Sequence, residues 1–292
     1  MDVVVIFNGL GNQMSQYAFY LSKLRYNPKC RVMFDPFSTN EHNGSELNRL
    51  FGVTYEDGIL SKFLKKIYTY KKRPKIWSML NKIGFRLIKE PVNYEYNEIF
   101  LKKGRFGVNF YVGGWHSEKY FENIRNEVCR QFSFPKIDAN SECASWIKEI
   151  KSNENSVSIH VRRGDFLKIE KNNPYQLGGV ATDYYYQSAV EKILQKVENP
   201  VFYCFSNDIE WCKRFFNGIN VKFVTCNSGK ESWRDLFLMS LCRHHINANS
   251  TFSWWGAWLS YMDGITICPN KFLLNTETKD IYPESWVKMP TE

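Results

Sequence analysis

The sequence has no long apolar run. Its first apolar stretch, residues 3–7, ends at Asn8, which makes it too short for a secretory signal peptide or a membrane span. No later stretch reaches spanning length. We therefore expect a cytoplasmic protein whose contact with a membrane, where it has one, is peripheral.

Sequence motifs that supply pairs of metal ligands are also missing. The eight cysteines are scattered without a C-x-x-C pair, and Cys204 lies in the apolar run VFYCF, which favours small buried thiols over disulfides or zinc. CRHH at 242–245 has no second ligand cluster at matching spacing. No D-x-D occurs, although many nucleotide-sugar enzymes hold pyrophosphate through a metal bound to such paired acids. We expect no metal and no cofactor.

Acidic residues are absent from one long segment. Residues 62–89 hold ten Lys or Arg and no Asp or Glu, in a chain whose net charge is +9. A solvated helical surface is the explanation that we favour. An anionic membrane surface also suits a basic segment rich in aromatic residues. Nucleic acid comes last, because no nucleic-acid-binding motif accompanies the charge.

What is present is an alternation of strand and helix patterns. Apolar runs at 3–7 and 31–35 flank residues 14–24, whose apolar positions have helical spacing. After a polar break at 151–156 the alternation restarts, with strands expected at 156–161, 201–206, 221–225, 244–248 and 265–268, and helices at 183–197, 208–216, 231–242 and 252–262. This order predicts an α/β protein of two Rossmann-like domains, 1–150 and 151–292, with parallel sheets that face a cleft.

Two adjacent arginines follow the strand at 156–161, in HVRRGDF. Alternation gives His160 and Arg162 one face of the strand and starts Arg163 on the other. The carboxyl ends of parallel strands are where open α/β sheets bind ligands, and guanidinium groups suit a phosphate or pyrophosphate. A salt bridge at the strand end, for example between Arg163 and Asp165, is the competing explanation. Two adjacent arginines, one of them on the same face as a histidine, favour ligand binding.

A second candidate anion site lies in HHINANSTFSWWGAWL, residues 244–259. The pattern predicts a strand, a short turn and a helix that begins near Ser250 and Thr251. A helix N-terminus presents unpaired N–H groups to an anion, although a simple N-cap is the commoner role for such a residue. Ser232 and Asp235 similarly fit a capping box, and their spacing alone indicates only a structural role.

A glycine-containing turn, FNGLGNQ, follows the first strand at 7–13. It departs from the dinucleotide-binding fingerprint because Met14 stands where the third glycine belongs. Two interpretations stay open. The segment is an ordinary turn with Asn12 as an N-cap, or a tight turn that lets a ligand approach the backbone.

Four motifs together resemble those of glycosyltransferase family 11, the α-1,2-fucosyltransferases: GLGNQMSQYAF (9–19), HVRRGDF (160–166), FSNDIEWCK (205–213) and NSTFSWWGAWLS (249–260). They occur in the family's order and spacing, and the resemblance runs from residue 3 to about residue 270. It implies a GT-B-like fold and an inverting, metal-independent transferase. The implied reaction moves L-fucose from GDP-β-L-fucose to the 2-hydroxyl of a terminal galactose.

The resemblance also implies roles for individual residues. Arg162 looks like the arginine that holds the donor pyrophosphate and stabilises the departing GDP, with Arg163 supporting that pocket. His160 and Asp235 are similar to guanine contacts of the wider fucosyltransferase superfamily. The implied phosphate-binding turn consists of Ser250, Thr251 and Phe252. Asn12 looks like the residue of the first domain that reaches the reaction centre. Asp165 is the nearest candidate for the catalytic base, or it orients Arg163.

Some positions depart from the family pattern. Asn8 precedes Gly9 where two glycines are common, Ser15 replaces a frequent aromatic residue, and GGWHS at 113–117 replaces a GYWQ-like stretch. These departures concern the acceptor more than the donor. The expected partners are GDP-fucose and a galactose-terminated oligosaccharide or lipid-linked glycan of bacterial polysaccharide biosynthesis, with no nucleic acid. The alternatives are another GDP-sugar transferase, another fucose linkage or a non-catalytic nucleotide- or glycan-binding protein.

Overall fold

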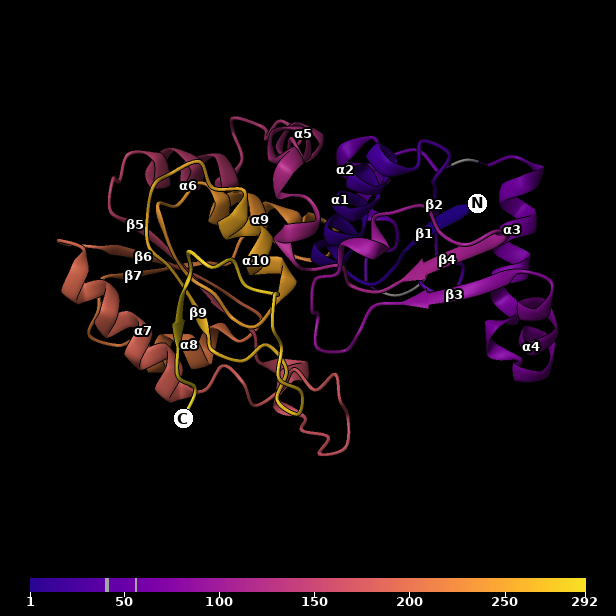
Figure 1. The fold of residues 1–292 in the computed structure, drawn as a ribbon. Helices are drawn as coiled ribbons and strands as arrows, with labels where there is room; N and C mark the ends of the chain where they lie inside the picture. The colour runs from indigo at the N-terminus through magenta and orange to yellow at the C-terminus, as the bar shows by residue number, and fades with distance from the viewer. Residues whose placement is uncertain (40–41, 56) are drawn as a thin grey trace. The chain divides into compact units, whose positions relative to one another are not determined.

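The computed structural model describes residues 1–39, 42–55 and 57–292, except for the side chain of Asp165. The chain divides into two compact units (Figure 1). Unit 1 comprises residues 1–135 and 279–281, and unit 2 comprises residues 136–278 and 282–292. The predicted boundary after residue 150 differs from this division. The helix at Glu142–Lys151 packs its Cys143 and Ile150 into a core of unit 2.

Within the described residues, unit 1 contains a four-stranded parallel sheet in the order β2-β1-β4-β3. Its strands are β1 (Asp2–Ile6), β2 (Arg31–Phe34), β3 (Phe85–Lys89) and β4 (Val108–Val112). Its helices are α1 (Leu10–Tyr26), α2 (Glu46–Phe51), α3 (Ile59–Thr69), α4 (Pro74–Lys82) and α5 (Arg125–Gln131), with short 3₁₀ turns η1 (Tyr70–Lys72), η2 (Glu98–Phe100), η3 (Glu118–Tyr120) and η4 (Glu122–Ile124). Every residue of β1 is buried, as expected for a central strand with helices on both faces.

In unit 2 the described residues form a six-stranded parallel sheet in the order β10-β9-β8-β5-β6-β7. Its strands are β5 (Ser156–Val161), β6 (Val201–Ser206), β7 (Val221–Val224), β8 (His244–Ile246), β9 (Thr266–Pro269) and β10 (Val287–Met289). Its helices are α6 (Glu142–Lys151), α7 (Asp183–Lys196), α8 (Ile209–Phe215), α9 (Trp233–Ser240) and α10 (Thr251–Trp258), with 3₁₀ turns η5 (Gly164–Leu167) and η6 (Gly229–Glu231).

The two faces of this sheet have separate cores. Val157, Ile159 and Val161 of β5 pack with α7 and α8 on one face. On the other face Tyr203 and Phe205 of β6 pack with α6, α9 and Phe252 of α10. The alternation of β5 therefore directs its odd-numbered residues toward α7 and α8, and its even-numbered residues toward α9 and α10.

These two parallel sheets confirm the predicted α/β class and the GT-B-like composition of two Rossmann-like domains. Strands and helices predicted after residue 156 are present with ends shifted by a few residues. The basic segment 62–89 forms most of α3, then η1, α4 and β3, so its final residues belong to a strand that the sequence did not indicate. The described cysteines are free thiols, and all except the half-buried Cys226 are buried, as predicted. No helix in the described ranges is long and apolar enough to cross a membrane.

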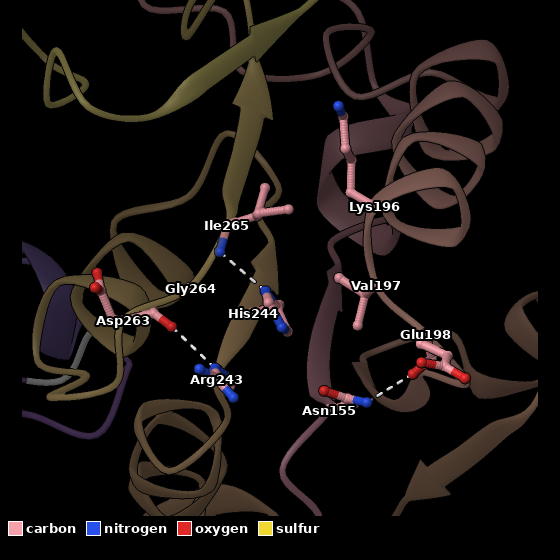
Figure 2. A pocket seen from close by; sticks show the side chains of 9 residues that line it. All are labelled: Asn155, Lys196, Val197, Glu198, Arg243, His244, Asp263, Gly264 and Ile265. Carbon is pink, nitrogen blue, oxygen red and sulfur yellow. Dashed lines mark hydrogen bonds between the residues drawn. The ribbon is translucent and has the colours of Figure 1, made fainter.

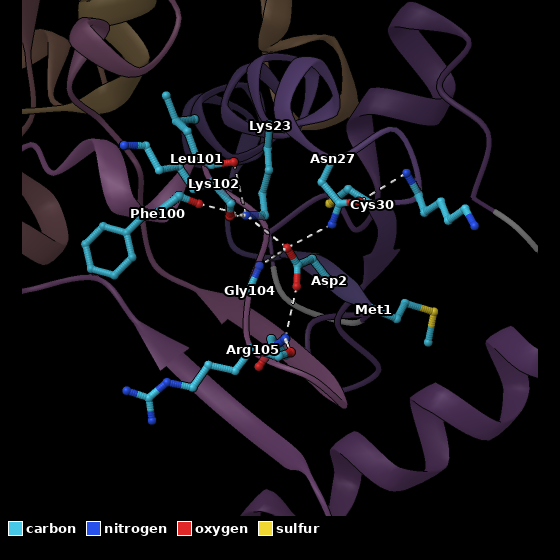
Figure 3. A network of polar contacts seen from close by, with 12 residues as sticks. Met1, Asp2, Lys23, Asn27, Cys30, Phe100, Leu101, Lys102, Gly104 and Arg105 are labelled. Atoms are coloured by element: carbon cyan, nitrogen blue, oxygen red, sulfur yellow. Dashed lines mark hydrogen bonds and ion pairs between the residues drawn. The ribbon is translucent and has the colours of Figure 1, made fainter.

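A buried ion pair anchors α1 to the sheet of unit 1 (Figure 3). Lys23 Nζ lies 3.1 Å from Asp2 Oδ2, and both side chains are almost fully buried. The ammonium also donates to the carbonyl oxygens of Phe100 and Lys102 at 2.8 and 2.7 Å. Asp2 accepts further hydrogen bonds from Asn27, Asn109 and the Gly104 amide.

The surroundings of Asp2 compensate for the loss of water. Burial by itself would raise the pKa of Asp2, but the amide of Gly104 and the charge of Lys23 outweigh that effect and lower it. Burial lowers the pKa of Lys23, and the charge of Asp2 opposes the change. A buried charge that keeps a partner and full hydrogen bonding is tolerated, whereas one that loses its partner is strongly destabilising. The pair therefore holds the N-terminal strand, α1 and the loop at 100–104 together.

We predict that Lys23→Met lowers the free energy of unfolding by about 3–5 kcal/mol, because it leaves the Asp2 carboxylate buried without a cation. Urea denaturation followed by circular dichroism measures the loss. Lys102→Met is the matched control, since Lys102 pairs with Glu98 at the surface and should cost less than about 1 kcal/mol. Equal losses in the two variants would contradict a structural role for the buried pair, and Asp2→Asn combined with Lys23→Met should recover part of the stability.

Candidate active site

Three strands of unit 2 end together at the carboxyl edge of the sheet. Val161 of β5 is level with Ser206 of β6, and Ile159 of β5 is level with Ile246 of β8. Because these strands are parallel, the segments that follow them meet at one edge. HVRRGDF and NSTFSWWGAWLS are therefore neighbours in space although about eighty residues separate them.

His160 is buried near the beginning of α10. Its ring centroid lies 5.8 Å from that of Phe252, which is the second residue of α10. Burial lowers the pKa of His160 to about 3, and the charge of Arg162 adds to the effect, so the imidazole is neutral at physiological pH. Its Nδ1 atom is buried and has no hydrogen-bond partner among the described residues.

The two arginines after β5 have different surroundings. The guanidinium carbon of Arg162 lies 5.6 Å from the ring centroid of Phe166, and the side chain is partly exposed. Its charge contributes to the lowered pKa of His160. Arg162 and His160 thus form a cationic and a neutral donor group at the same strand end.

Arg163 points toward α7 and α8 and acts as a clamp between them. Its Nε atom lies 3.3 Å from Asp208 Oδ2, and its Nη1 atom lies 3.7 Å from Asp183 Oδ1. The guanidinium also stacks over Trp211 at 4.2 Å from the ring centroid. A strand-end salt bridge is therefore present, but its acids are at the starts of α7 and α8. The side chain of Asp165, the predicted partner and candidate base, lies outside the described residues.

The beginning of α10 combines the two roles that the sequence left open. Ser250 is the N-cap, and its hydroxyl accepts a hydrogen bond from the Phe252 amide at 3.3 Å. No acidic residue occupies the first turn, and Ser250, Thr251 and Phe252 are all half-buried. The capping role of Ser250 is confirmed, and the phosphate-binding role of the turn stays a prediction.

Asp235 has a different partner from the one that the capping-box pattern predicted. Ser232 makes no side-chain cap to α9, and Asp235 Oδ1 accepts a hydrogen bond from Asn227 Nδ2 at 2.7 Å. Burial raises the pKa of Asp235 to about 7, although the bond from Asn227 opposes the rise. A carboxyl group whose pKa is raised by burial in this way is typical of functional positions.

The helices that carry Asp235 and Phe252 are closely packed. A Cβ atom added at Gly256 of α10 would lie 2.9 Å from Met239 Cβ of α9, so the contact requires a glycine. This contact sets α9 beside α10 on the face of the sheet that His160 occupies. His160, Asp235 and Phe252 therefore belong to one layer of unit 2.

Asn249 is a residue of this edge that the sequence reasoning missed. Its Nδ2 atom donates to the carbonyl oxygens of Leu177 and Phe272 at 2.8 and 2.9 Å, which fixes the loops that follow β5 and β9. Its Oδ1 atom and Asn247 Nδ2 are buried without a hydrogen-bond partner among the described residues. Buried polar atoms that the protein does not satisfy are expected where a ligand or water completes the bonding. The polar run NANS directly after a strand was the available signal.

In unit 1 the corresponding edge is formed by the loops after β1, β3 and β4. The helix α1 begins one residue after its N-cap Gly9, which provides no side-chain cap. Asn12 is consequently in the first helical turn and is half-buried, so of the two open interpretations the one that made Asn12 an N-cap is wrong. Gln16 ties this helix to the edge, because it accepts from the Phe7 amide and donates to the Gly113 carbonyl.

A buried carboxyl group organises the loop after β4. Glu90 Oε2 accepts hydrogen bonds from the amides of Gly114 and Trp115 at 2.7 and 2.8 Å. Burial raises the pKa of Glu90 to about 8, although the two amides oppose the rise, so the group is largely neutral at pH 7. A Cβ atom at Gly113 would lie 2.4 Å from Glu90 Cβ, and one at Gly114 would lie 2.2 Å from His116 Nε2. Both glycines of GGWHS are therefore required by the fold of this loop.

Backbone strain gathers at the same edge. Among the described non-glycine residues, those with positive φ include Asn8 at 63°, Tyr94 at 53° and Trp115 at 52°, which follow β1, β3 and β4 respectively. His42, in the segment after β2, also has a positive φ of 53°. Such conformations persist where surrounding structure enforces them, and they are concentrated at functional sites. The carboxyl edge of this sheet is therefore a second candidate functional region.

A pocket at the opposite edge of the unit 2 sheet does not contain the predicted site residues (Figure 2). It is lined by residues at or near the starts of β5, β6, β8 and β9, together with the end of α7. Its polar groups bond to the backbone: His244 Nδ1 accepts from the Ile265 amide, and Arg243 Nε donates to the Asp263 carbonyl. These bonds give the groove a structural role. In the described part of the chain, no group of three or more His, Cys, Asp or Glu is arranged to hold a metal ion.

The known proteins that this chain resembles are glycosyltransferases. The profile described as Glycosyl transferase family 11 matches residues 3–290. An α-1,2-colitosyltransferase of Escherichia coli is 34% identical to this chain, and the alignment covers 99% of each protein. The O-antigen biosynthesis glycosyltransferase WbnK of Escherichia coli is 29% identical, with 96% of this chain and 98% of that protein covered. Galactoside alpha-(1,2)-fucosyltransferase 1 of Homo sapiens is 27% identical over 58% of this chain and 49% of its own length.

We predict that Glu90 makes the stability of the protein fall as pH rises. Folding raises the pKa of Glu90 from 4.5 to about 8. Its stabilising contribution is therefore complete below about pH 4.5 and is lost as pH rises through about 8. Between about pH 5 and about pH 8 the wild type should lose free energy of unfolding relative to Glu90→Gln, by up to about 1.4 kcal/mol per pH unit. Urea denaturation across this range measures the difference.

Glu98→Gln is the matched control for this experiment, because Glu98 is exposed and forms an ion pair with the surface residue Lys102. Its stability should follow that of the wild type at each pH. A difference between wild type and Glu90→Gln that stays constant with pH would show that Glu90 is ionised in the fold.

Proposed function

We propose that this chain, which belongs to glycosyltransferase family 11, is a galactoside α-1,2-fucosyltransferase. In this proposal it transfers L-fucose from GDP-β-L-fucose to the 2-hydroxyl of a terminal galactose, with inversion and without a metal. The observation that carries the proposal is the meeting, at one edge of the unit 2 sheet, of Arg162, the start of α10 and the unsatisfied Nδ1 atom of His160. Cation, helix end and ring nitrogen together suit a nucleoside diphosphate.

The donor chemistry follows from the charges at that edge. The bond between C1 of fucose and the β-phosphate oxygen breaks, so negative charge grows on that oxygen while the sugar becomes cationic. Arg162 and the positive end of α10, at residues 250–252, are the groups that would stabilise this charge. They would act as a fixed cation and fixed dipoles. In other nucleotide-sugar enzymes a divalent metal stabilises the same charge.

The guanine base would be held by His160 and Asp235. A carboxylate accepts hydrogen bonds from the N–H groups of a guanine edge, and a neutral imidazole supplies one donor and one acceptor. Phe252 lies near His160 and offers an apolar surface to the nucleotide. Arg163 contributes to this pocket through the clamp that orients the start of α8 and the residues after β5.

The acceptor would be bound by the carboxyl edge of unit 1, where the strained loops after β1, β3 and β4 lie. Asn12, in the uncapped first turn of α1, would orient the galactose 2-hydroxyl. The acceptor oxygen forms a new bond to C1 of fucose on the face opposite GDP, and its proton must leave. Asp165 is our candidate for the group that takes the proton.

A second donor is favoured by one specific observation. The relative with 34% identity is named an α-1,2-colitosyltransferase, and colitose is L-fucose without the 3-hydroxyl group. The linkage would be the same, and the donor pocket would differ only around C3 of the sugar. The name of the second Escherichia coli relative refers to O-antigen biosynthesis. We therefore propose a bacterial, cytoplasmic enzyme that builds a surface polysaccharide from a galactose-terminated or lipid-linked acceptor.

The transfer reaction tests the proposal directly. We expect purified protein to transfer fucose from GDP-fucose to lactose or N-acetyllactosamine, with equal rates in the presence and absence of EDTA, and linkage analysis should give an α-1,2 product. Arg162→Ala should lower turnover by about 10²-fold or more, and Arg162→Lys should not restore it because lysine lacks the planar fork. The matched control is Arg214→Ala, which removes an exposed cation at the end of α8.

The other outcomes distinguish the alternatives. Transfer from GDP-colitose with little transfer from GDP-fucose would select the second donor. GDP binding without turnover on any β-galactoside would indicate a non-catalytic nucleotide-binding protein. Loss of activity in EDTA that a divalent metal restores would contradict the metal-independent mechanism.

Asp235 should make GDP affinity depend on pH. Its pKa is raised to about 7, so the acceptor carboxylate is lost as pH falls below that value. The Kd for GDP should therefore decrease as pH rises through about 7, by up to about tenfold per pH unit. Isothermal titration calorimetry measures it. Asp235→Asn is the matched variant, because residue 235 no longer titrates in it while GDP itself still does. A pH dependence identical in wild type and variant would exclude Asp235 from guanine binding.

A further inference from the structure

Two chain segments meet at the amino-terminal edge of the unit 1 sheet, where β3 and β4 begin (Figure 1). The Val108 amide donates to the Gly84 carbonyl at 2.9 Å, and Arg86 donates to the Phe106 carbonyl. A Cβ atom at Gly107 would lie 2.2 Å from the Gly84 oxygen, so the backbones are as close as glycine allows. This contact sets Ile83, the C-cap of α4, beside the loop that carries Phe106.

The side chains at this contact are apolar and exposed. Phe106 is 99% exposed, Ile83 is 73% exposed and Met79 is 69% exposed. Met79 and Ile83 are four residues apart, so they lie on one stripe at the end of α4. None of the residues of α4 is fully buried. We call Met79, Ile83 and Phe106 the apolar tip. Single exposed apolar residues are normal, whereas a cluster of large ones indicates an interaction surface.

Basic residues accompany the apolar tip on both segments. Lys82 immediately precedes Ile83, and Lys103 and Arg105 precede Phe106, all of them exposed. We call these three residues the basic rim. No Asp or Glu occurs between residues 58 and 89 or between residues 99 and 117, so neither segment supplies an acid that would neutralise the rim.

We infer that the apolar tip and the basic rim dock unit 1 onto the surface of an anionic lipid bilayer. Aliphatic and aromatic side chains that project from a basic surface can enter the interfacial region, while lysine and arginine contact the lipid phosphates. An RNA partner would account for the cations, but it offers no apolar environment to Ile83 and Met79. The combination of both side-chain types favours the bilayer.

The position of this surface is compatible with catalysis. The tip lies at the amino-terminal edge of the sheet, whereas Asn12 and the loop held by Glu90 lie at the carboxyl edge of the same sheet. Docking through the tip therefore leaves the carboxyl edge of unit 1 uncovered. The inference goes beyond the proposed transfer reaction and does not depend on which sugar is transferred.

Flotation of the full-length protein with vesicles tests the inference. We expect the wild type to float with vesicles of phosphatidylcholine mixed with phosphatidylglycerol and to stay unbound with phosphatidylcholine alone. The triple variant Met79→Ser, Ile83→Ser, Phe106→Ser should lower the bound fraction by about tenfold or more. The triple variant Lys82→Glu, Lys103→Glu, Arg105→Glu should lower it at least as far, because it reverses the charge that attracts anionic lipid.

Two matched controls separate this surface from general properties of the chain. Tyr261→Ser with Met262→Ser removes exposed apolar side chains from unit 2. Lys148→Glu, Lys151→Glu and Lys230→Glu change the net charge by the same amount at exposed positions of unit 2. Both controls should float like the wild type. Circular dichroism and urea denaturation check that each variant is folded.

The result that overturns the inference is wild-type binding that the tip and rim variants retain, or wild-type protein that does not float with anionic vesicles. Binding to a single-stranded RNA that the rim variant loses, without any flotation of the wild type, would assign the surface to nucleic acid instead. Because flotation is read from the protein itself, it is independent of whether fucose transfer is observed.

Discussion

The parallel pairing of β5 with β8 is the constraint on which the candidate donor site depends. It brings the residues that follow Val161 beside those that follow Ile246, and so joins two motifs that lie far apart in the sequence. The packing of α10 against α9 at Gly256 then brings Phe252 to His160. A larger residue at position 256 would force α10 and α9 apart. The anion-binding potential of Arg162 and α10 is thus a consequence of sheet register and of one glycine contact.

Burial has opposite consequences for the polar groups of this edge. Arg163 is neutralised by two carboxylates and covered by an indole, which makes it a structural clamp. His160 is buried with its Nδ1 atom lacking a partner among the described residues, whereas Asp235 is half-buried and bonds to Asn227. Burial moves the pKa values of both groups toward their neutral forms. A protein gains no stability from such groups, since desolvation costs more than their few bonds return. Their presence is understandable when a ligand completes the bonding.

The two edges of the unit 1 sheet differ in character. The carboxyl edge holds strained loops and a buried carboxyl group, and these conformations need a rigid support. The Lys23–Asp2 pair supplies part of that support by fastening α1 to the strand β1 and to the loop at 100–104. The amino-terminal edge has the opposite character, because Ile83 and Phe106 are exposed there. A sheet buried on both faces presents only its edges to ligands and surfaces.

Local patterns in the sequence determined the α/β class, most strands and helices after residue 156, and the faces of β5. Strand alternation and helical spacing act between neighbouring residues, so they are readable without a structure. The tertiary structure decided which acids meet Arg163, that Asp235 bonds to Asn227 instead of capping α9, and that Glu90 holds the loop after β4. It also decided that Ile83 and Phe106 share one tip. These contacts join residues distant in sequence, and their burial and pKa values depend on packing that no local pattern encodes.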